Sequence, residues 1–230
     1  MDISQFKGGL IVSCQAPPGD PLRDPYIMAA MARAAELGGA VGIRANGPDD
    51  VAAIRRAVRL PIIGIFKQQT EGYPVYITPT LEAARAVVDA GADLVAVDAT
   101  PRPRVGGLSP RELIEAIHTE LHVPVMADIS TFEEGVAAAE AGADIVATTL
   151  SGYTEESKAQ ALRGPDIELV RRLAEVLPVP VICEGRIHTP EDLKAVFEAG
   201  AFAAVVGTAI TRPQWITEQF VAVTPRRAAR

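Results

Sequence analysis

Residues 91–98, GADLVAVD, decide the fold, because they join the end of an alanine-rich helical stretch to a short apolar strand. The same Gly-Ala junction, with successive spacings of 52, 51 and 58 residues, returns at residues 39–40, 142–143 and 200–201. Proline followed by a β-branched residue enters the strands between these junctions, at Pro61, Pro124 and Pro180. The sequence therefore repeats a βαβα unit four times, which is typical of a closed barrel.

Eight apolar segments alternate with eight helical patterns along the chain. The expected strands are apolar on both faces, as in parallel sheets covered by helices; they span residues 9–15, 40–45, 61–67, 94–100, 123–130, 145–152, 179–187 and 203–210. The expected helices span residues 25–37, 49–58, 81–90, 110–121, 131–141, 165–177, 189–199 and 213–223. Eight βα units predict an α/β fold of the (β/α)8 TIM-barrel type. The alternative is an open doubly wound sheet, which shares the local pattern.

The length and composition indicate one globular domain. The 230 residues are 48% hydrophobic and 22% charged, which excludes a mainly disordered chain. We expect the barrel to occupy residues 1–223 and a short basic tail, residues 224–230, to be disordered. No apolar run approaches 18 residues, and the first ten residues do not have the pattern of a secretion signal. We therefore expect neither a membrane span nor a signal peptide.

The net charge and the numbers of cysteines and histidines bear on which partners, cofactors and cellular location we expect. The formal net charge of −7 argues against a nucleic-acid-binding surface, and any phosphate site must be built locally from backbone N–H groups and a few arginines. Two cysteines, Cys14 and Cys183, cannot form a disulfide framework and indicate a cytoplasmic location. Three scattered histidines and the lack of nucleotide-binding motifs predict neither a metal nor a nucleotide cofactor.

Polar residues end the odd-numbered strands, at the end of the barrel where active sites of this fold lie. These residues are Gln15, Lys67, Asp128 and Glu184. Asp128 and Glu184 each come four residues after the proline that enters their strand, and Lys67 comes six residues after its own, so all three should point to the same side. A lysine and two carboxylates in an apolar barrel are unfavourable unless they are used. We predict a catalytic cluster here rather than a structural ion pair.

A second group of residues follows the seventh and eighth strands, where barrel enzymes often bind phosphate. It comprises Gly185, Arg186, Gly207, Thr208 and Arg212. Glycine lets backbone N–H groups approach a phosphate closely, and an arginine can make a bidentate contact. We expect a phosphate site; the alternative is that the glycines only ease packing between strands and helices.

Several further residues leave alternatives open. Arg44 ends the second strand and faces the same mouth, so we favour a substrate contact over an ion pair. The role of Asp98 stays open, because it could contact substrate or pair with Arg44. The role of His188 also stays open, because it follows the seventh strand and could approach the site. The helix over residues 213–223 carries an apolar face with Trp215, which is either core or a dimer contact. We expect a homodimer.

Nine segments carry a resemblance to a known family: IVSCQA, VGIRA, GIFK, VYITPT, VDATPRPR, MADISTFEEG, TTLSGYT, ICEGRI and VVGTAITRP. They resemble the N-acylglucosamine-6-phosphate 2-epimerase family, also called N-acetylmannosamine-6-phosphate epimerases, over nearly the whole chain. The resemblance implies a TIM barrel that interconverts N-acetylmannosamine 6-phosphate and N-acetylglucosamine 6-phosphate in sialic acid and amino-sugar catabolism. It also implies that no nucleotide or metal is needed.

The resemblance assigns roles to individual residues. The family's catalytic lysine falls on Lys67 and its catalytic glutamate on Glu184. Its substrate-contacting positions fall on Gln15, Arg44, Asp128 and Arg212. Its phosphate loops fall on Gly185, Arg186, Gly207 and Thr208. The segment after Lys67, QQTEGYP, departs from the family pattern, so a contact from Tyr73 stays open.

These residue types fit proton transfer at a carbon next to an aldehyde. The C2 hydrogen of an open-chain 2-acetamido aldose is acidic, and its return on the other face inverts C2. Lys67 could act as the base when neutral, and Glu184 could assist ring opening or move the proton on the opposite face. One-base and two-base mechanisms both remain open. The alternatives are another phosphosugar epimerase or isomerase, a Schiff-base aldolase, and a non-catalytic phosphosugar sensor.

Overall fold

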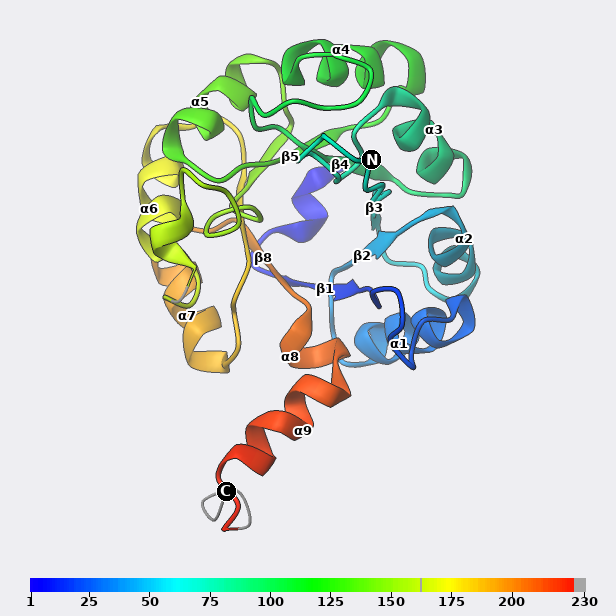
Figure 1. Ribbon diagram of the computed structural model, residues 1–230, viewed down its shortest axis with the longest axis vertical. Helices are drawn as coiled ribbons and strands as arrows, with labels where there is room; N and C mark the ends of the chain where they lie inside the picture. The colour runs from blue at the N-terminus through cyan, green and yellow to red at the C-terminus, as the bar shows by residue number, and fades with distance from the viewer. Residues whose placement is uncertain (162, 226–230) are drawn as a thin grey trace.

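The computed structural model describes residues 1–161 and 163–225, and within them eight parallel strands close into a barrel in sequential order (Figure 1). The strands are β1 (Leu10–Cys14), β2 (Gly42–Asn46), β3 (Ile62–Ile65), β4 (Leu94–Asp98), β5 (Val125–Asp128), β6 (Ile145–Ala147), β7 (Val181–Glu184) and β8 (Ala203–Val206). Strand β8 pairs with β1, so the sheet has no free edge. The TIM-barrel prediction is confirmed, and the open sheet is excluded.

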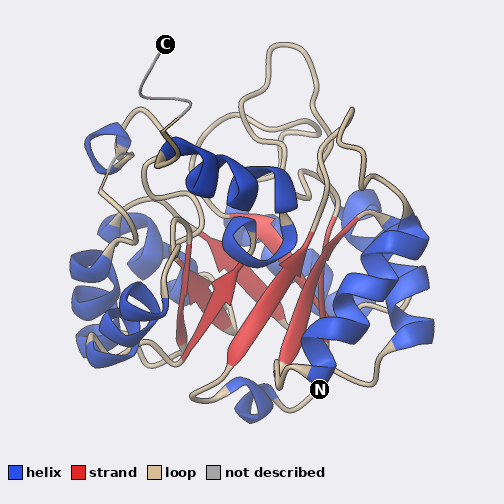
Figure 2. Cartoon of the chain, turned by 90° about the horizontal axis from the view of Figure 1, so that it is seen from below, coloured by secondary structure: helices blue, strands red, loops and turns tan. Residues whose placement is uncertain are grey.

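Helices surround the barrel, which Figure 2 shows from the side with the strands enclosed. They are α1 (Pro25–Leu37), α2 (Pro48–Ala57), α3 (Leu81–Asp89), α4 (Pro110–Leu121), α5 (Phe132–Glu140), α6 (Ile167–Val176), α7 (Pro190–Glu198), α8 (Thr208–Thr211) and α9 (Pro213–Ala222). Two short 3-10 helices, η1 (Ile3–Phe6) and η2 (Lys158–Gln160), lie outside this pattern. Helix α9 extends away from the barrel in Figure 1. Most of the tail predicted at 224–230 lies outside the described residues.

Capping side chains set where several helices begin. Capping boxes start three of them, formed by Ser109 with Glu112, Thr131 with Glu134, and Thr189 with Asp192. The helix expected from residue 165 begins two residues later, because the Asp166 side chain accepts a hydrogen bond from the Leu169 N–H and so acts as the N-cap.

All strands except β2, which ends one residue later than expected at Asn46, end earlier than the apolar pattern suggests. The strand expected over 203–210 ends at Val206, because the chain turns at Gly207, whose carbonyl accepts hydrogen bonds from the N–H groups of Ile210 and Thr211. Residues 208–211 therefore form the short helix α8. The strands expected over 145–152 and 179–187 likewise end at Ala147 and Glu184. In each case the polar residues beyond the ladder become part of the loops at the barrel mouth.

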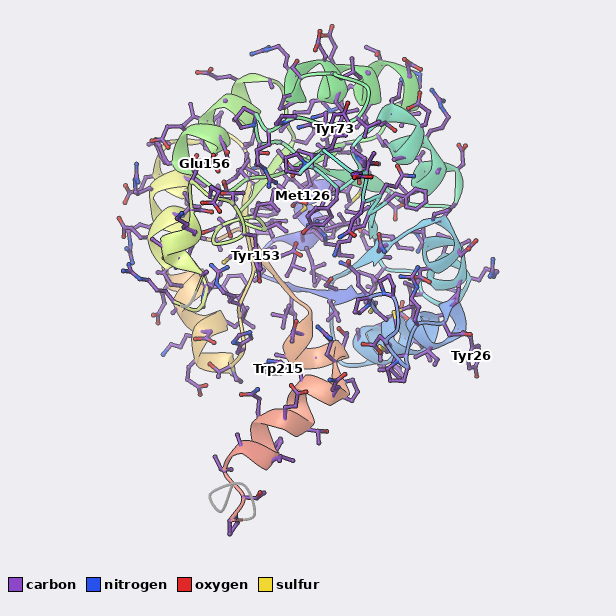
Figure 3. All side chains as sticks on the ribbon, viewed as in Figure 1. Tyr26, Tyr73, Met126, Tyr153, Glu156 and Trp215 are labelled. Carbon is purple, nitrogen blue, oxygen red and sulfur yellow. The ribbon has the colours of Figure 1, made fainter. Side chains whose placement is uncertain are left out.

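Alternate residues of the strands fill the barrel interior. This inner cluster includes Ile11, Ile63, Leu94, Met126, Ile145, Ile182 and Val205, all almost completely buried. Met126 lies at the centre of the barrel in Figure 3. Phe6 of η1 joins the inner cluster at the N-terminal end, and Gly42 makes room for it, since a Cβ there would lie 2.5 Å from the Phe6 ring. The interior is a packed core that supports the residues above it.

Two Gly-Ala junctions share a hydrogen-bond pattern at the N-terminal end of the barrel. Asp93 Oδ2 accepts from the Ile62 N–H at 2.8 Å and from Arg55 at 2.9 Å. Asp144 Oδ2 accepts from the Val125 N–H at 2.7 Å and lies 2.7 Å from the His118 ring. Each aspartate thus ties an even-numbered strand to the preceding odd-numbered one. Two of the four βαβα units of the sequence thus share the same contacts.

Candidate active site

Three charged side chains from different strands meet at the C-terminal end of the barrel. Arg44 of β2 donates two hydrogen bonds to Asp128 of β5, at 3.0 and 2.5 Å. It also donates to Glu184 of β7 at 2.5 Å. Asp128 comes two residues after Met126 of the inner cluster and Glu184 two after Ile182, so the strand alternation directs both carboxylates inward. Asp128 and Glu184 therefore point to the same side, as the proline spacing predicts.

The cluster is almost entirely shielded from water. The side chains of Arg44 and Asp128 are 1% and 0% exposed, and that of Glu184 is 14% exposed. Thr149, at the mouth beyond β6, donates to Asp128 at 2.6 Å. Such a cluster is stable only if every charge is compensated, because desolvation alone would be strongly unfavourable.

This environment shifts the pKa of two members of the cluster. Burial raises the pKa of Glu184 to about 7, and the nearby Asp128 adds to the increase, while the Arg44 and Lys67 cations oppose it. Burial disfavours the charge on Arg44, but the Asp128 and Glu184 carboxylates together outweigh this and raise its pKa. Glu184 can therefore gain or lose a proton near neutral pH, whereas Arg44 stays charged.

Lys67 stands at the same mouth, two residues beyond the end of β3. Surrounding protein lowers its pKa by desolvation, and the Arg44 cation lowers it further, while Glu184 and Asp128 act in the opposite direction. By its accessible surface, however, Lys67 is an exposed residue, and contact with water limits the decrease in its pKa. The two carboxylates therefore do not cancel the effect of burial, and the neutral amine is favoured relative to an ordinary lysine.

Gln15 and Arg212 both lie near the C-terminal end of β1. Gln15 donates to Ser13 at 2.7 Å, and its buried Oε1 has no partner among the described residues. Arg212, at the junction of α8 and α9, lies 3.9 Å from the Asp20 carboxylate of the loop between β1 and α1. Its buried Nε likewise has no partner in the part of the chain described. Both side chains thus keep hydrogen-bonding capacity for a ligand.

The residues predicted to bind phosphate offer mainly backbone N–H groups, because the Arg186 side chain is engaged elsewhere. Gly185 and Arg186 have positive φ angles of 113° and 56°, so the chain turns sharply after β7. The Arg186 side chain donates to the carbonyls of Gly164 and Ser151, at 2.7 and 2.5 Å. The Arg186 side chain is therefore held by the long loop between β6 and α6. The phosphate contact predicted for Arg186 would have to come from its backbone N–H instead. Gly207 and Thr208 begin α8, whose first N–H groups have no partner within the helix.

Asp98, the last residue of β4, forms a buried polar network with the segment that leads to α4. Asp98 is fully buried, accepts from both the N–H and the hydroxyl of Thr100, and pairs with Arg102 at 2.7 Å. It therefore does not pair with Arg44.

Tyr76, from the loop between β3 and α3, packs on the inner cluster. Burial raises the pKa of Tyr76, and the Asp128 and Asp98 carboxylates add to the increase. The only sequence signal for Tyr76 was its place in the VYITPT segment.

Three aromatic or imidazole side chains lie at the edge of the mouth. Tyr73 is 43% exposed on the loop after Lys67 and lies away from the α9 side of the barrel in Figure 3. The His188 ring packs against Trp215 of α9 with 4.7 Å between ring centroids. His188 thus has a packing partner that connects the loop after β7 to α9. Among the described residues no group of three or more His, Cys, Asp or Glu side chains is placed to hold a metal ion.

The sequence matches a family model over residues 28–225, and that family is described as "Putative N-acetylmannosamine-6-phosphate epimerase". Curated relatives carry the name "Putative N-acetylmannosamine-6-phosphate 2-epimerase". A protein of Caldanaerobacter subterraneus subsp. tengcongensis is 55% identical over 223 residues, which cover 96% of this chain and 93% of the relative. One from Cutibacterium acnes is 52% identical over 220 residues, which cover 95% and 94% of the two chains.

Solved structures agree with this match. The N-acetylmannosamine-6-phosphate 2-epimerase from Clostridium perfringens superposes with a TM-score of 0.91 at 46% identity, covering 95% of this chain and 94% of that one. Thiamine phosphate pyrophosphorylase from Pyrococcus furiosus, at 17% identity and a TM-score of 0.63, shares the fold alone. No helix among the described residues is long and apolar enough to cross a membrane. With the family model matching most of its length, the chain belongs to the N-acetylmannosamine-6-phosphate epimerase family.

Proposed function

We propose that the mouth of this barrel epimerises N-acetylmannosamine 6-phosphate and N-acetylglucosamine 6-phosphate at C2, with Lys67 and Glu184 as the catalytic residues. The observation that carries the proposal is the buried cluster of Arg44, Asp128 and Glu184 beside a lysine whose pKa is lowered. It provides a carboxyl group with a pKa of about 7, an amine whose pKa is lowered, and a fixed cation at one mouth.

Proton removal from C2 requires an amine that is neutral and within reach of the substrate. In the open-chain sugar the C1 aldehyde makes the C2 hydrogen acidic, and its loss gives an enediolate-like intermediate. Lys67 takes this proton in its neutral form, which burial and the Arg44 cation favour. The negative charge that develops on O1 needs a fixed donor, and the Arg44 guanidinium is held in place by two carboxylates.

Glu184 is the second proton-transfer group. With a pKa of about 7, it is present in both protonation states at neutral pH. Strand β7 lies across the barrel from β3, so Glu184 approaches the sugar from the side opposite Lys67. It is suited to open the sugar ring or to return the proton on the other face of C2.

The remaining polar groups bind the two ends of the substrate. Gln15 and Asp128 face the mouth and offer hydrogen bonds to the sugar. The backbone N–H groups at Gly185, Arg186, Gly207 and Thr208, together with the Arg212 side chain, bind the 6-phosphate. This assignment is supported by the turn after β7 and by the start of α8, which lie on neighbouring strands.

A conversion assay tests this proposal. Proton NMR of N-acetylmannosamine 6-phosphate with the purified protein, without added metal or nucleotide, should show N-acetylglucosamine 6-phosphate appearing. Borohydride treatment during turnover should leave Lys67 unmodified, whereas trapping of substrate on Lys67 would favour the aldolase alternative. Binding without conversion would favour the sensor. Conversion of a different phosphorylated sugar alone would indicate another epimerase or isomerase.

We also propose a cytoplasmic homodimer that does not bind nucleic acid. The reduced, buried thiols of Cys14 and Cys183 support the location, and the net charge of −7 argues against nucleic acid. The dimer is supported by the C-terminal end of α9, where Phe220 is 72% exposed and Val223, the residue that follows the helix, is 84% exposed. Light scattering should give twice the chain mass for the wild type, and Phe220→Glu should lower that mass. A monomeric wild type would contradict the proposal.

A further inference from the structure

The backbone around Lys67 is held by a small antiparallel hairpin above β3. The Gln68 N–H donates to the Tyr76 carbonyl at 2.9 Å, and the Thr78 N–H donates to the Phe66 carbonyl at 3.0 Å. Lys67 lies opposite Ile77 between these two bonds. In an antiparallel pair, a residue at such a position directs its own N–H and C=O away from its partner strand. The Lys67 N–H therefore needs an acceptor outside the hairpin.

Asn46, the last residue of β2, supplies that acceptor. Its side-chain Oδ1 accepts from the Lys67 N–H at 2.8 Å. On the other side of the hairpin, the Asp98 N–H of β4 donates to the Ile77 carbonyl at 3.1 Å. The hairpin is thus fastened to both strands that flank β3. No other side chain among the described residues makes a hydrogen bond to the backbone of Lys67.

Thr78 gives a second indication that this geometry is enforced. It is fully buried and has φ = 45°, a conformation that is unfavourable for a β-branched residue. Its hydroxyl accepts from the Phe66 N–H at 3.0 Å, next to Lys67 in the chain. A backbone conformation of this kind persists only where neighbouring contacts enforce it. Here the hydrogen bond from Phe66 to the Thr78 hydroxyl also fixes the residue before Lys67.

We propose that Asn46 is a positioning residue that holds Lys67 at the distance and direction needed for proton transfer. The inference rests on the proposed role of Lys67 as the base. Asn46 is the half-buried last residue of β2 and pairs with Ile65 of β3, so the regular strand holds its side chain in place against the lysine backbone. A displacement of the lysine by even one ångström would lower the rate without removing any group that binds substrate.

Steady-state kinetics of two Asn46 variants test this role. Asn46→Ala removes the acceptor and should lower kcat on the order of 10- to 100-fold, with KM changed far less. Asn46→Asp keeps an acceptor but adds a negative charge near the lysine, which favours the ammonium form. The pH at which kcat/KM rises should therefore be higher in Asn46→Asp. At alkaline pH this variant should recover most of the rate that Asn46→Ala loses.

Ser109→Ala provides the matched control. It also removes a side-chain acceptor of a backbone N–H, at the N-cap of α4 rather than beside the lysine. It should lower thermal stability while leaving kcat and its pH profile unchanged. If Asn46→Ala loses stability but keeps kcat, or if Asn46→Asp recovers no rate at any pH, the positioning role is wrong.

Lys67→Ala separates this inference from the proposed function. If that variant keeps its turnover, the assignment of the base is wrong whatever the Asn46 variants do. If Lys67→Ala is inactive and Asn46→Ala behaves like Ser109→Ala, only the positioning role fails. A drop in kcat in both, with alkaline recovery in Asn46→Asp alone, supports the two assignments together.

Discussion

At the scale of single residues, Arg44 determines the charge balance of the mouth. It is the cation that compensates the buried Asp128 and Glu184 carboxylates. We expect Arg44→Ala to lower the free energy of unfolding by about 3–5 kcal/mol, because it leaves two carboxylates unpaired in a buried site. The catalytic activity of Arg44→Ala should fall as well, because the variant lacks the cation proposed to stabilise the charge on O1. Arg44→Lys, which keeps the charge but loses the bidentate contact, should be intermediate in urea unfolding. Equal stability of all three proteins would contradict this account.

Glu184 gives the protein a characteristic pH dependence of stability. Its pKa rises from 4.5 to about 7 on folding, so between these values the folded protein holds a proton that the unfolded chain has lost. The free energy of unfolding contributed by this residue therefore decreases as pH rises through that window and is constant above it. Urea unfolding of Glu184→Gln should lack this decrease. Parallel wild-type and variant curves from pH 4.5 to 7.5 would show that the pKa is not raised.

At the scale of elements, Asp93 and Asp144 each tie one pair of strands together. Asp144→Ala leaves the buried Val125 N–H without its acceptor and should lower the free energy of unfolding by about 1–3 kcal/mol. Asp93→Ala should have a similar effect through Ile62, because the contacts are equivalent. Both lie at the end of the barrel away from the mouth, so kcat should be unchanged below the unfolding transition. A loss of kcat in the folded variants would show that this end affects the site.

The elements were predictable where their signals are local. Helices α1 and α4 have the bounds that their periodicity predicts, since Pro25 and Pro110 each follow a capping residue. The strand ends were less predictable, because the apolar pattern continues past the last ladder bond. The turn at Gly207 depends on hydrogen bonds from residues 210 and 211, which a strand pattern does not reveal.

The site was predictable to the extent that it follows strand parity. The proline spacing placed Asp128 and Glu184 on one face, and both point inward. Tyr76 and Asn46 were missed, because their places depend on how a hairpin folds over β3. The side chain of Arg186 was also not predictable, because its acceptors are carbonyls of a loop more than twenty residues away.

At the scale of the whole molecule, the inner cluster closes the barrel and supports the mouth. Phe6 fills the N-terminal end and is fully buried. We expect Phe6→Ala to lower the free energy of unfolding by about 3–5 kcal/mol through the cavity it leaves. Tyr26→Ala on α1, where the ring is 81% exposed, should change it by less than about 0.5 kcal/mol. Equal effects of the two variants would mean that Phe6 does not close the core.

The central claim is that Lys67 moves the C2 proton in the mouth of this barrel. The most direct measurement is proton NMR of N-acetylmannosamine 6-phosphate in D2O with the wild type and with Lys67→Ala, after circular dichroism has shown both to be folded. The wild type should form N-acetylglucosamine 6-phosphate with deuterium at C2, and the variant should be slower by at least about 100-fold in both exchange and conversion. Conversion without deuterium at C2, or normal exchange by Lys67→Ala, would contradict the claim.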